Sequence, residues 1–216
     1  MKDKLKESSK AHVIYKLADG TRVCGVTTIL SILAKPALIK WANNLGLQGI
    51  DSSKYTDSAA RIGTLAHYMV QCYLSGDATD FSEYSNTEID QAENALLSFF
   101  EWSKGHEIKP IFLEKGLVSE TYQFGGTIDC YAEIDGKLTL CDFKTGSGIY
   151  EEHYYQLCAY RQLLFEHGHE VKKAIILNIP RKETEDFAEK VFTDFNNGWE
   201  IFHHCLALYN LKRAKS

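Results

Sequence analysis

The stretch from Gly126 to Phe143 constrains the fold more than any other part of the sequence. Two runs rich in apolar and β-branched residues, 126–134 and 137–143, are separated only by Asp135-Gly136. That pair is typical of the tight turn of a β-hairpin. The run from Ile111 to Val118 has the same strand character, so the pattern predicts three consecutive strands in the second half of the chain.

Helical patterns precede and follow these strands. The first half predicts a hairpin over 13–26 that turns at Asp19-Gly20, a short helical segment over 27–33, and helices over 36–45, 57–74 and 87–104; we expect Gly46 to end the first of these helices and Thr87 to cap the last. The hairpin is followed by an expected helix over 151–167, a buried strand over 173–179, an edge strand over 191–194 and a closing helix over 196–212. This order predicts an α/β protein whose central mixed β-sheet is flanked by helices. We expect a single domain, with a helical N-terminal part over about 27–105 and a core over about 108–216.

Composition narrows the class of protein. The chain has 216 residues, of which 44% are hydrophobic and 25% charged, as in ordinary globular proteins. No apolar run approaches the ~20 residues that span a bilayer, and the polar segment Met1–Lys10 is unlike a signal peptide, so we expect a cytoplasmic protein. The six cysteines form no CxxC pair, which argues against a zinc or iron–sulfur site. The net charge of −5 is unusual for a nucleic-acid-binding protein, although carboxylates that bind a metal also lower it.

Two carboxylates fall on the predicted hairpin. Asp129 lies in its first strand, and Asp142 lies near the end of its second strand. Carboxylates on neighbouring strands can chelate a hard divalent cation, and the backbone carbonyl of Phe143 is a candidate further ligand. Because alternate residues of a strand share a face, Lys144 projects to the same side as Asp142, while Phe143 points into the core.

This combination suits hydrolysis of a phosphodiester bond. A divalent cation polarises the phosphoryl oxygen and lowers the pKa of a water molecule, and a lysine can orient that water or stabilise the added negative charge. The alternative is that Asp142 and Lys144 are ordinary polar residues that end a strand, because Asp-x-Lys often occurs by chance. Its position directly after a hairpin that also carries Gly126-Thr127-Ile128-Asp129 favours the catalytic interpretation.

These motifs resemble those of the PD-(D/E)XK nuclease superfamily, in its RecB-like exonuclease branch. The resemblance rests on Gly126-Thr127-Ile128-Asp129, Asp142-Phe143-Lys144-Thr145-Gly146, Gln156-x-x-x-Tyr160 and the upstream stretch Gly25 to Leu30 with Lys35-Pro36 and Trp41. It is strongest with mitochondrial genome maintenance exonucleases and their phage-encoded relatives. Ile128 stands where the superfamily name has Pro, and Asp142 replaces the commoner Glu. The resemblance implies a restriction-endonuclease-like core and a Mg²⁺ or Mn²⁺ cofactor.

The resemblance also implies roles for further residues. His67, in the pattern Arg61-Ile62-Gly63-Thr64-Leu65-Ala66-His67, would be a helical metal ligand rather than a core histidine. Glu114 fits an acidic position near the metal, and Glu120 competes with it for that place; each has the alternative of being a surface carboxylate. Gln156 would lie near the catalytic lysine and the cleaved strand, with a helix that only packs into the core as the alternative. Tyr160 would pack in the core with its hydroxyl near the site, where it is a candidate contact to DNA. Thr145 begins a loop that can hold a phosphate.

The predicted activity is metal-dependent hydrolysis of DNA from free ends, with single strands preferred, in replication, recombination or repair. The resemblance places the N-terminal helices over the active site, where Lys35, Lys40 and Arg61 would contact the DNA backbone. Trp41 either stacks on a base or packs in the core. Two alternatives stay open: a structure-specific endonuclease or resolvase on the same fold, and a DNA-binding module whose nuclease site has decayed. DNA, as single strands or duplex ends, is the partner to expect, and replication or recombination proteins are candidates for further partners.

Overall fold

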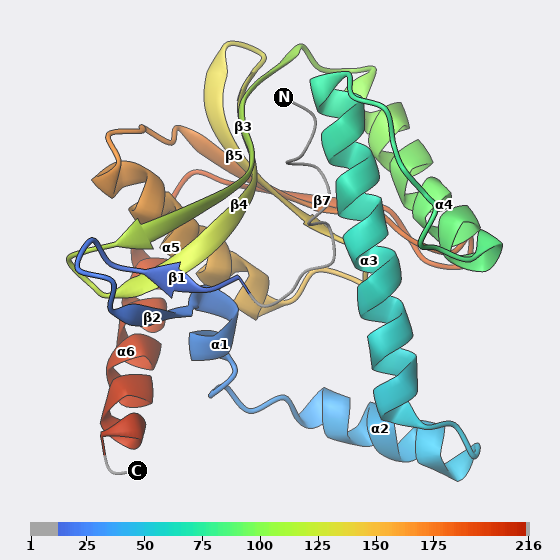
Figure 1. Cartoon of the computed structure of the whole chain (residues 1–216), viewed down its shortest axis with the longest axis horizontal. Coiled ribbons are helices and arrows are strands. Elements are labelled where there is room, and N and C mark those ends of the chain that lie inside the picture. The colour runs from blue at the N-terminus through green and yellow to red at the C-terminus, as the bar shows by residue number, and fades with distance from the viewer. Residues whose placement is uncertain (1–12, 215–216) are drawn as a thin grey trace.

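A seven-stranded mixed sheet, covered by helices on both faces, forms the centre of the described part of the molecule (Figure 1). The structure is a computed structural model that describes residues 13–214, so the prediction for Met1–Lys10 lies outside the described residues. The strands are β1 (Tyr15–Lys16), β2 (Arg22–Gly25), β3 (Ile108–Ser119), β4 (Phe124–Ile134), β5 (Lys137–Lys144), β6 (Lys173–Asn178) and β7 (Ala188–Phe192). Their order is β1-β2-β4-β5-β6-β7, and β3 also pairs with β4.

The predicted hairpin at the centre of the sheet is confirmed. Ile134 pairs with Lys137, and Asp135 and Gly136 between them have φ angles of 51° and 74°. Positive φ at both turn positions is the geometry that Asp-Gly favours in a two-residue hairpin loop. Strand β5 then pairs in parallel with β6, because the intervening helix α5 (Glu151–Glu166) carries the chain back along the face of the sheet.

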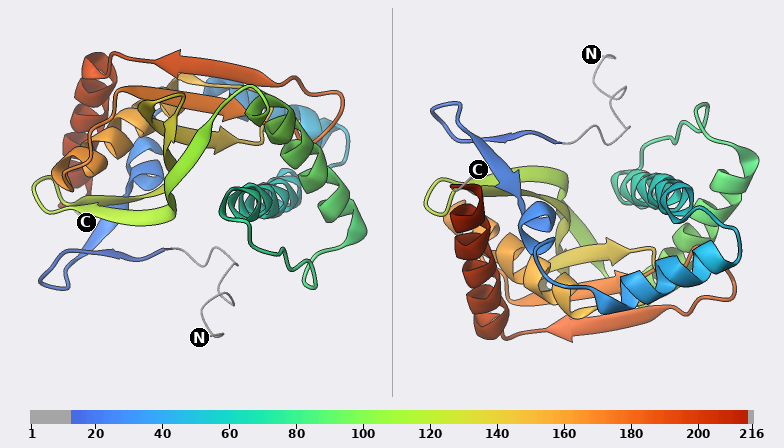
Figure 2. Two further views of the ribbon diagram at one scale, coloured as in Figure 1. Left: turned by 90° about the horizontal axis from the view of Figure 1, so that it is seen from above. Right: turned by 90° about the horizontal axis from the view of Figure 1, so that it is seen from below.

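Each face of the sheet has its own apolar core. On one face, α1 (Val26–Leu30), α5 and α6 (Asn196–Arg213) pack against side chains such as Ile128 and Leu140. On the other face, α3 (Ser52–Ser75) and α4 (Asn86–Ser103) pack against Cys141 and Phe143. Figure 2 shows these two groups of helices on opposite sides of the strands. The predicted α/β architecture, with a central mixed sheet flanked by helices and a helical N-terminal region, is confirmed.

Several predicted boundaries were wrong by a few residues, for local reasons. Helix α4 is capped by Ser85 rather than Thr87, because the Ser85 hydroxyl accepts from the Glu88 N–H and the Glu88 carboxylate accepts from the Ser85 N–H. Helix α3 begins five residues early, at Ser52, where the Asp51 side chain caps it. Edge strand β7 lies at 188–192 rather than 191–194 because it pairs with β6 in that register.

Helix α2 (Pro36–Leu47) differs from the other helices because none of its residues is buried. It continues through Gly46, the residue expected to end it. Figure 1 shows it running between α1 and α3, away from the sheet. At its start Lys35 Nζ lies 2.8 Å from a carboxylate oxygen of Glu152, on the first turn of α5. Across residues 13–214, the structure contains no helix with the length and apolar character needed to cross a membrane.

Candidate active site

Three carboxylates from three adjacent strands lie at one level of the sheet. The β3–β4 ladder pairs Leu113 with Cys130 and Lys115 with Ile128, which places Glu114 opposite Asp129. The β4–β5 ladder ends at Cys130 and Cys141, one step before Asp129 and Asp142 would pair. The side chains of Glu114 and Asp129 therefore lie close together, and Asp142 lies beside Asp129 where β4 parts from β5.

The opening between β4 and β5 is fixed by a side chain. The backbone N–H of Phe143 donates to Asp129 Oδ2 at 2.9 Å, in place of a bond to the neighbouring strand. The Phe143 ring points away from the face that carries Asp142 and Lys144, as the alternation of the strand predicts. It lies edge-on to Phe99 in the core beneath α3 and α4, and edge-on to the His67 ring at 6.0 Å between centroids. This hydrogen bond ties one carboxylate oxygen of Asp129 to the backbone of β5, the strand that carries Asp142.

Glu114 has a backbone conformation that non-glycine residues rarely adopt. Its φ angle is 47°, in the middle of strand β3. A left-handed residue of this kind costs about 1–2 kcal/mol and persists only where the surrounding structure holds it, often at a functional site. The conformation delivers the Glu114 carboxylate to the site, whereas the competing Glu120 accepts a hydrogen bond from the Ala18 N–H at 2.7 Å.

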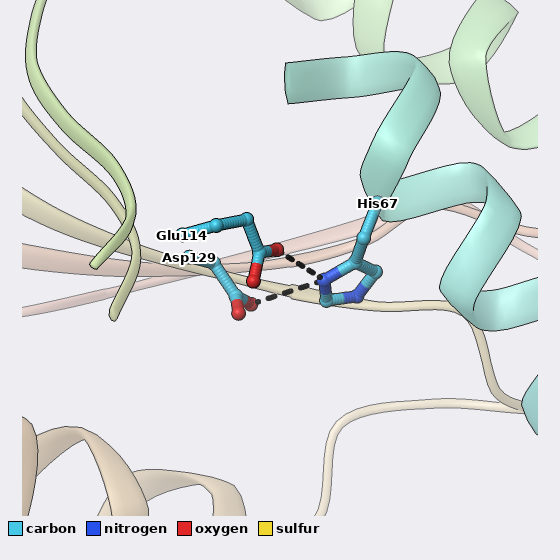
Figure 3. A group of neighbouring side chains, drawn as sticks. All are labelled: His67, Glu114 and Asp129. Atoms are coloured by element: carbon cyan, nitrogen blue, oxygen red, sulfur yellow. Dashed lines mark ion pairs between the residues drawn. The ribbon is translucent and has the colours of Figure 1, made fainter. Parts of the chain in front are cut away.

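Helix α3 adds a histidine to these carboxylates. His67 Nδ1 lies 3.5 Å from Glu114 Oε1 and 3.6 Å from Asp129 Oδ2 (Figure 3). The candidate ligand atoms of all three residues lie within 4.8 Å of one another. One imidazole nitrogen and one oxygen from each of two carboxylates at this spacing form a ligand set that suits a single divalent cation.

Asp142 gives a second indication that a cation belongs here. Its side chain is 1% exposed, and its Oδ1 atom has no hydrogen-bond partner among residues 13–214. Burial raises the pKa of Asp142 to about 6; the Lys144 ammonium opposes this rise and the Asp129 carboxylate adds to it. The Lys144 ammonium supplies one positive charge to the adjacent carboxylates of Asp142 and Asp129. The negative charge that is left over, together with the unpartnered Oδ1 atom, fits a divalent cation.

Lys144 is held between the sheet and helix α5. Its Nζ lies 2.6 Å from Asp142 Oδ2 and donates to Gln156 Oε1 at 2.9 Å. Gln156 in turn donates through Nε2 to the Tyr160 hydroxyl at 2.7 Å. Gln156 and Tyr160 share one face of α5, four residues apart, and both are buried. The chain of contacts fixes the position of the lysine ammonium beside the carboxylates.

The residues expected to contact DNA lie in different surroundings. Thr145 lies against α3, since a Cβ atom on Gly63 would come within 2.8 Å of its hydroxyl. Lys40 is exposed on α2 and forms no ion pair with any residue in the described range 13–214. Trp41 is 37% exposed and meets Tyr55 edge-on at 5.6 Å between ring centroids. Lys35 is paired with Glu152, as described above.

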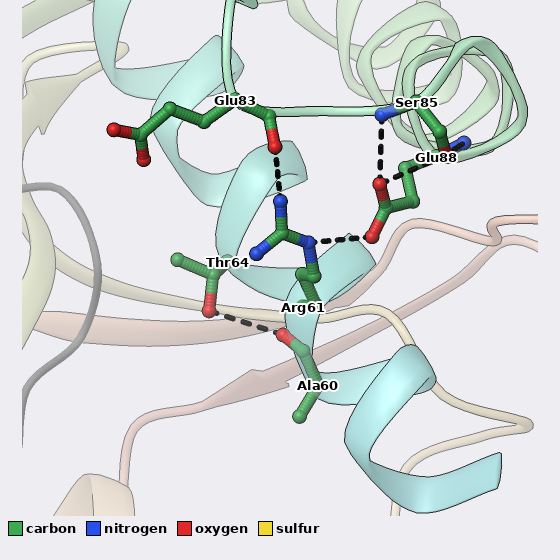
Figure 4. A network of polar contacts seen from close by, with 6 residues as sticks. All are labelled: Ala60, Arg61, Thr64, Glu83, Ser85 and Glu88. Atoms are coloured by element: carbon green, nitrogen blue, oxygen red, sulfur yellow. Dashed lines mark hydrogen bonds and ion pairs between the residues drawn. The ribbon is translucent and has the colours of Figure 1, made fainter. Parts of the chain in front are cut away.

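Arg61 has several partners within the protein (Figure 4). Its Nε lies 2.6 Å from Glu88 Oε1, and its Nη2 donates to the backbone carbonyl of Glu83. The guanidinium also lies over the Tyr84 ring, 4.7 Å from its centroid. These contacts join α3 to the start of α4, and they favour a structural role for Arg61.

The sequence did not point to Tyr15 and Thr127 as members of this site. The Tyr15 hydroxyl lies 2.9 Å from Thr127 Oγ1, and Thr127 is two residues before Asp129 on β4. The two residues are 112 positions apart in the chain, so no local pattern could connect them.

Comparison with known proteins adds little to this geometry. No protein-family model and no curated protein match the chain. Among solved structures, a candidate exonuclease from Eubacterium rectale is similar over 72% of this chain and 65% of its own, with 14% identity and a TM-score of 0.46. The protein SSO0001 is similar over 67% of this chain and 73% of its own, with 18% identity and a TM-score of 0.31. The chain thus spans less than two thirds of the Eubacterium rectale protein, and its function has to be inferred from its own side chains.

Proposed function

We propose that this protein is a metal-dependent deoxyribonuclease that hydrolyses phosphodiester bonds. The observation that carries the proposal is the convergence of Asp129 and Asp142 at the opening between two strands, with Lys144 2.6 Å from the second carboxylate. A sheet stabilised only by packing has no need of two carboxylates at this depth, because each costs free energy to bury.

The metal ligands would be the clustered His67, Glu114 and Asp129. Asp142 and the Phe143 carbonyl, on the neighbouring strand β5, are further candidates. When bound, Mg²⁺ or Mn²⁺ polarises a phosphoryl oxygen and lowers the pKa of a nearby water molecule. Among proteins of this chemistry, the arrangement of Asp129, Asp142 and Lys144 corresponds to the PD-(D/E)XK pattern, and Gln156 with Tyr160 corresponds to its RecB-like exonuclease branch.

Lys144 supplies the positive charge that the protein itself contributes. Its ammonium is fixed by Asp142 on one side and by Gln156 on the other, so little reorganisation is needed when a phosphate arrives. It stabilises the negative charge that develops on the phosphoryl oxygens as the bond to the leaving oxygen breaks. Gln156 keeps the lysine in place through its own bond to Tyr160.

Cleavage from free ends and a preference for single strands are the finer parts of the proposal. They are supported by α2, which stands away from the sheet with no buried residue and carries Lys40 and Trp41 on its exposed surface. A strand that passes beneath such a helix would meet a positive charge for its phosphates and a ring for its bases. Each phosphate contact that a lysine such as Lys40 makes would release counterions, so binding should weaken as salt increases.

The decisive experiment compares linear and circular single-stranded DNA of the same sequence, in Mg²⁺ or Mn²⁺. We expect the linear strand to be degraded and the circle to persist. Equal rates would exclude the requirement for an end and favour an endonuclease with the same catalytic residues. No cleavage of either substrate, under conditions in which the protein binds both metal and DNA, would favour a decayed nuclease.

A further inference from the structure

Two consecutive glycines of β4 have a tyrosine ring on each side of the strand. A Cβ atom added to Gly125 would come within 2.3 Å of Tyr15 Cγ, and one added to Gly126 would come within 2.5 Å of Tyr160 Cε1. Any side chain at either position would therefore collide with a ring. Because Gly125 has no side chain, the Tyr15 ring of the N-terminal hairpin packs directly on the backbone of β4. Gly126 makes the same room for the Tyr160 ring of α5, three residues before Asp129.

The hydroxyl groups of these two tyrosines have different surroundings. Tyr160 is 5% exposed, and its hydroxyl accepts from Gln156 in the interior. Tyr15 is only partly buried, and its hydroxyl lies 2.9 Å from Thr127 Oγ1. Thr127 and Asp129 are two residues apart on β4 and therefore share a face of the strand. Tyr15 therefore forms part of the wall of the site at the metal-ligand cluster, rather than part of the core.

The tyrosine hydroxyl is a neutral donor at neutral pH, and the surroundings of Tyr15 do not change this. Burial raises the pKa of Tyr15, the bond to Thr127 opposes this rise, and the carboxylates of Glu114 and Asp129 raise the pKa further. Thr127 has a proton of its own and can donate to the Tyr15 oxygen. In that arrangement the Tyr15 O–H points away from Thr127 and is available to an acceptor in the site.

We infer that Tyr15 donates a hydrogen bond from its hydroxyl to a non-bridging oxygen of the scissile phosphate, and that Thr127 positions that hydroxyl. The inference rests on the proposed nuclease function and adds a neutral donor to it. A donor fixed where negative charge develops stabilises the transition state more than the bound substrate. Helix α5, which carries Gln156 beside Lys144, lies on one side of β4. Tyr15 would act on the phosphate from the other side.

The first test is Tyr15→Phe, which removes only the hydroxyl. We expect the rate of cleavage of a linear single strand to fall at least about tenfold, while the melting temperature and the affinity for the strand without metal stay unchanged. Tyr209→Phe is the matched control, because the Tyr209 hydroxyl accepts from Cys24 Sγ of the same N-terminal hairpin at 3.3 Å, away from the site. This control should cleave at the wild-type rate.

The role of Thr127 is tested by two substitutions. Thr127→Val removes the hydroxyl at nearly constant shape and should reproduce the loss seen in Tyr15→Phe, whereas Thr127→Ser keeps the hydroxyl and should retain activity. Because Thr127 acts through Tyr15, the double variant Tyr15→Phe/Thr127→Val should be no slower than Tyr15→Phe alone. If Tyr15→Phe unfolds, the comparison of Thr127→Val with Thr127→Ser carries the test.

The outcomes separate this inference from the proposed function. Wild-type cleavage by Tyr15→Phe, together with inactive Asp142→Ala and Lys144→Ala, would overturn the role of Tyr15 and leave the nuclease function standing. A fall in activity that follows a fall in melting temperature, with no difference between Thr127→Val and Thr127→Ser, would show that Tyr15 only supports the fold. If the wild-type protein cleaves no DNA with any divalent metal, both proposals fail.

Discussion

The Asp129 side chain accepts a hydrogen bond from the backbone N–H of Phe143, at 2.9 Å from Oδ2. One carboxylate thus has two tasks, since it holds open the gap between β4 and β5 and also faces His67 and Glu114. The same side chain thus supports the fold and belongs to the candidate metal site. Substitutions that differ in hydrogen-bonding capacity separate these two roles.

Asp129→Asn and Asp129→Ala should both lose activity but should differ in stability. Each removes the charge at the proposed metal site, so the cleavage rate should fall by at least ~10²-fold. The asparagine oxygen can still accept from Phe143, whereas alanine leaves that buried N–H without its partner, at a cost of about 1–3 kcal/mol. Denaturant unfolding and a cleavage assay on the same preparations check this prediction. An active Asp129→Ala variant would contradict the assignment of the site.

Lys144→Ala should abolish cleavage while the fold survives. It removes the ammonium beside Asp142 and the donor to Gln156 Oε1, so the developing charge on the phosphate loses its stabilising partner. Lys173→Ala, on the neighbouring strand β6 and away from the carboxylates, is the control. A well-folded Lys144→Ala variant with full activity would refute the catalytic role of the lysine.

The parts of this fold and site that the sequence predicted are those set by local chemistry. Asp135-Gly136 requires the tight hairpin turn, and the alternation of β5 places Asp142 and Lys144 on one face and Phe143 on the other. Each of these follows from residues within a few positions of one another. The motif therefore predicted that Asp142 and Lys144 share one face of β5, without knowledge of the rest of the fold.

The features that the sequence did not predict depend on distant partners. Tyr15 contacts Thr127 on β4, which is 112 positions later in the chain. Its ring fits there only because Gly125 has no side chain. The sequence shows Arg61 only as a basic side chain that could contact a phosphate, but in the fold its guanidinium pairs with Glu88 and lies over the Tyr84 ring. The sequence could not decide whether Glu114 or Glu120 lies near the metal site, because the backbone conformation of Glu114, with its φ of 47°, is not visible in the sequence.

Activity should require a divalent cation, and His67→Ala should weaken its binding. We expect Mg²⁺ and Mn²⁺ to support cleavage and Ca²⁺ to support binding of DNA with little cleavage, because Ca²⁺ holds its ligands more loosely. Removal of the His67 imidazole deletes one of the three clustered ligand groups, so the apparent affinity for Mn²⁺ should fall. Calorimetric titration with Mn²⁺ measures this directly, with His203→Ala on exposed α6 surface as the control. Unchanged metal binding would make His67 a core histidine.

Arg61→Ala should reduce stability rather than the affinity for DNA. Its bonds to Glu88 and to the Glu83 carbonyl, with its position over Tyr84, join α3 to α4, and their loss should cost about 1–2 kcal/mol on a half-exposed side chain. Lys40→Ala is the comparison, because Lys40 is exposed on α2. The salt dependence of strand binding distinguishes the two, since each lost phosphate contact lowers its slope by about one. A lower slope in Arg61→Ala at unchanged stability would restore Arg61 as a DNA contact.

Asp142→Asn should stabilise the metal-free protein at neutral pH. Burial is the main reason that the pKa of Asp142 is raised to about 6 in the folded state. The value in the unfolded chain is about 3.9. Between these values the folded protein binds more protons than the unfolded chain, so the free energy of unfolding decreases as pH rises from about 4 to about 6. Above that range the cost of the buried charge is fully present, and at roughly 1.4 kcal/mol per pKa unit it amounts to about 1–3 kcal/mol.

Asparagine does not titrate, so the stability difference between Asp142→Asn and the wild type should depend on pH. In unfolding measured in chelator at pH 7.5, Asp142→Asn should be more stable than the wild type, and this difference in the free energy of unfolding should fall toward pH 4.5. Asp135→Asn is the opposite control, because the contact with His106 and the Glu107 N–H lowers the pKa of Asp135. That carboxylate stabilises the protein at neutral pH and loses its effect as the pH falls, so Asp135→Asn should be less stable than the wild type at pH 7.5. A pH-independent difference for Asp142→Asn would mean that Asp142 carries no buried charge for a cation to compensate.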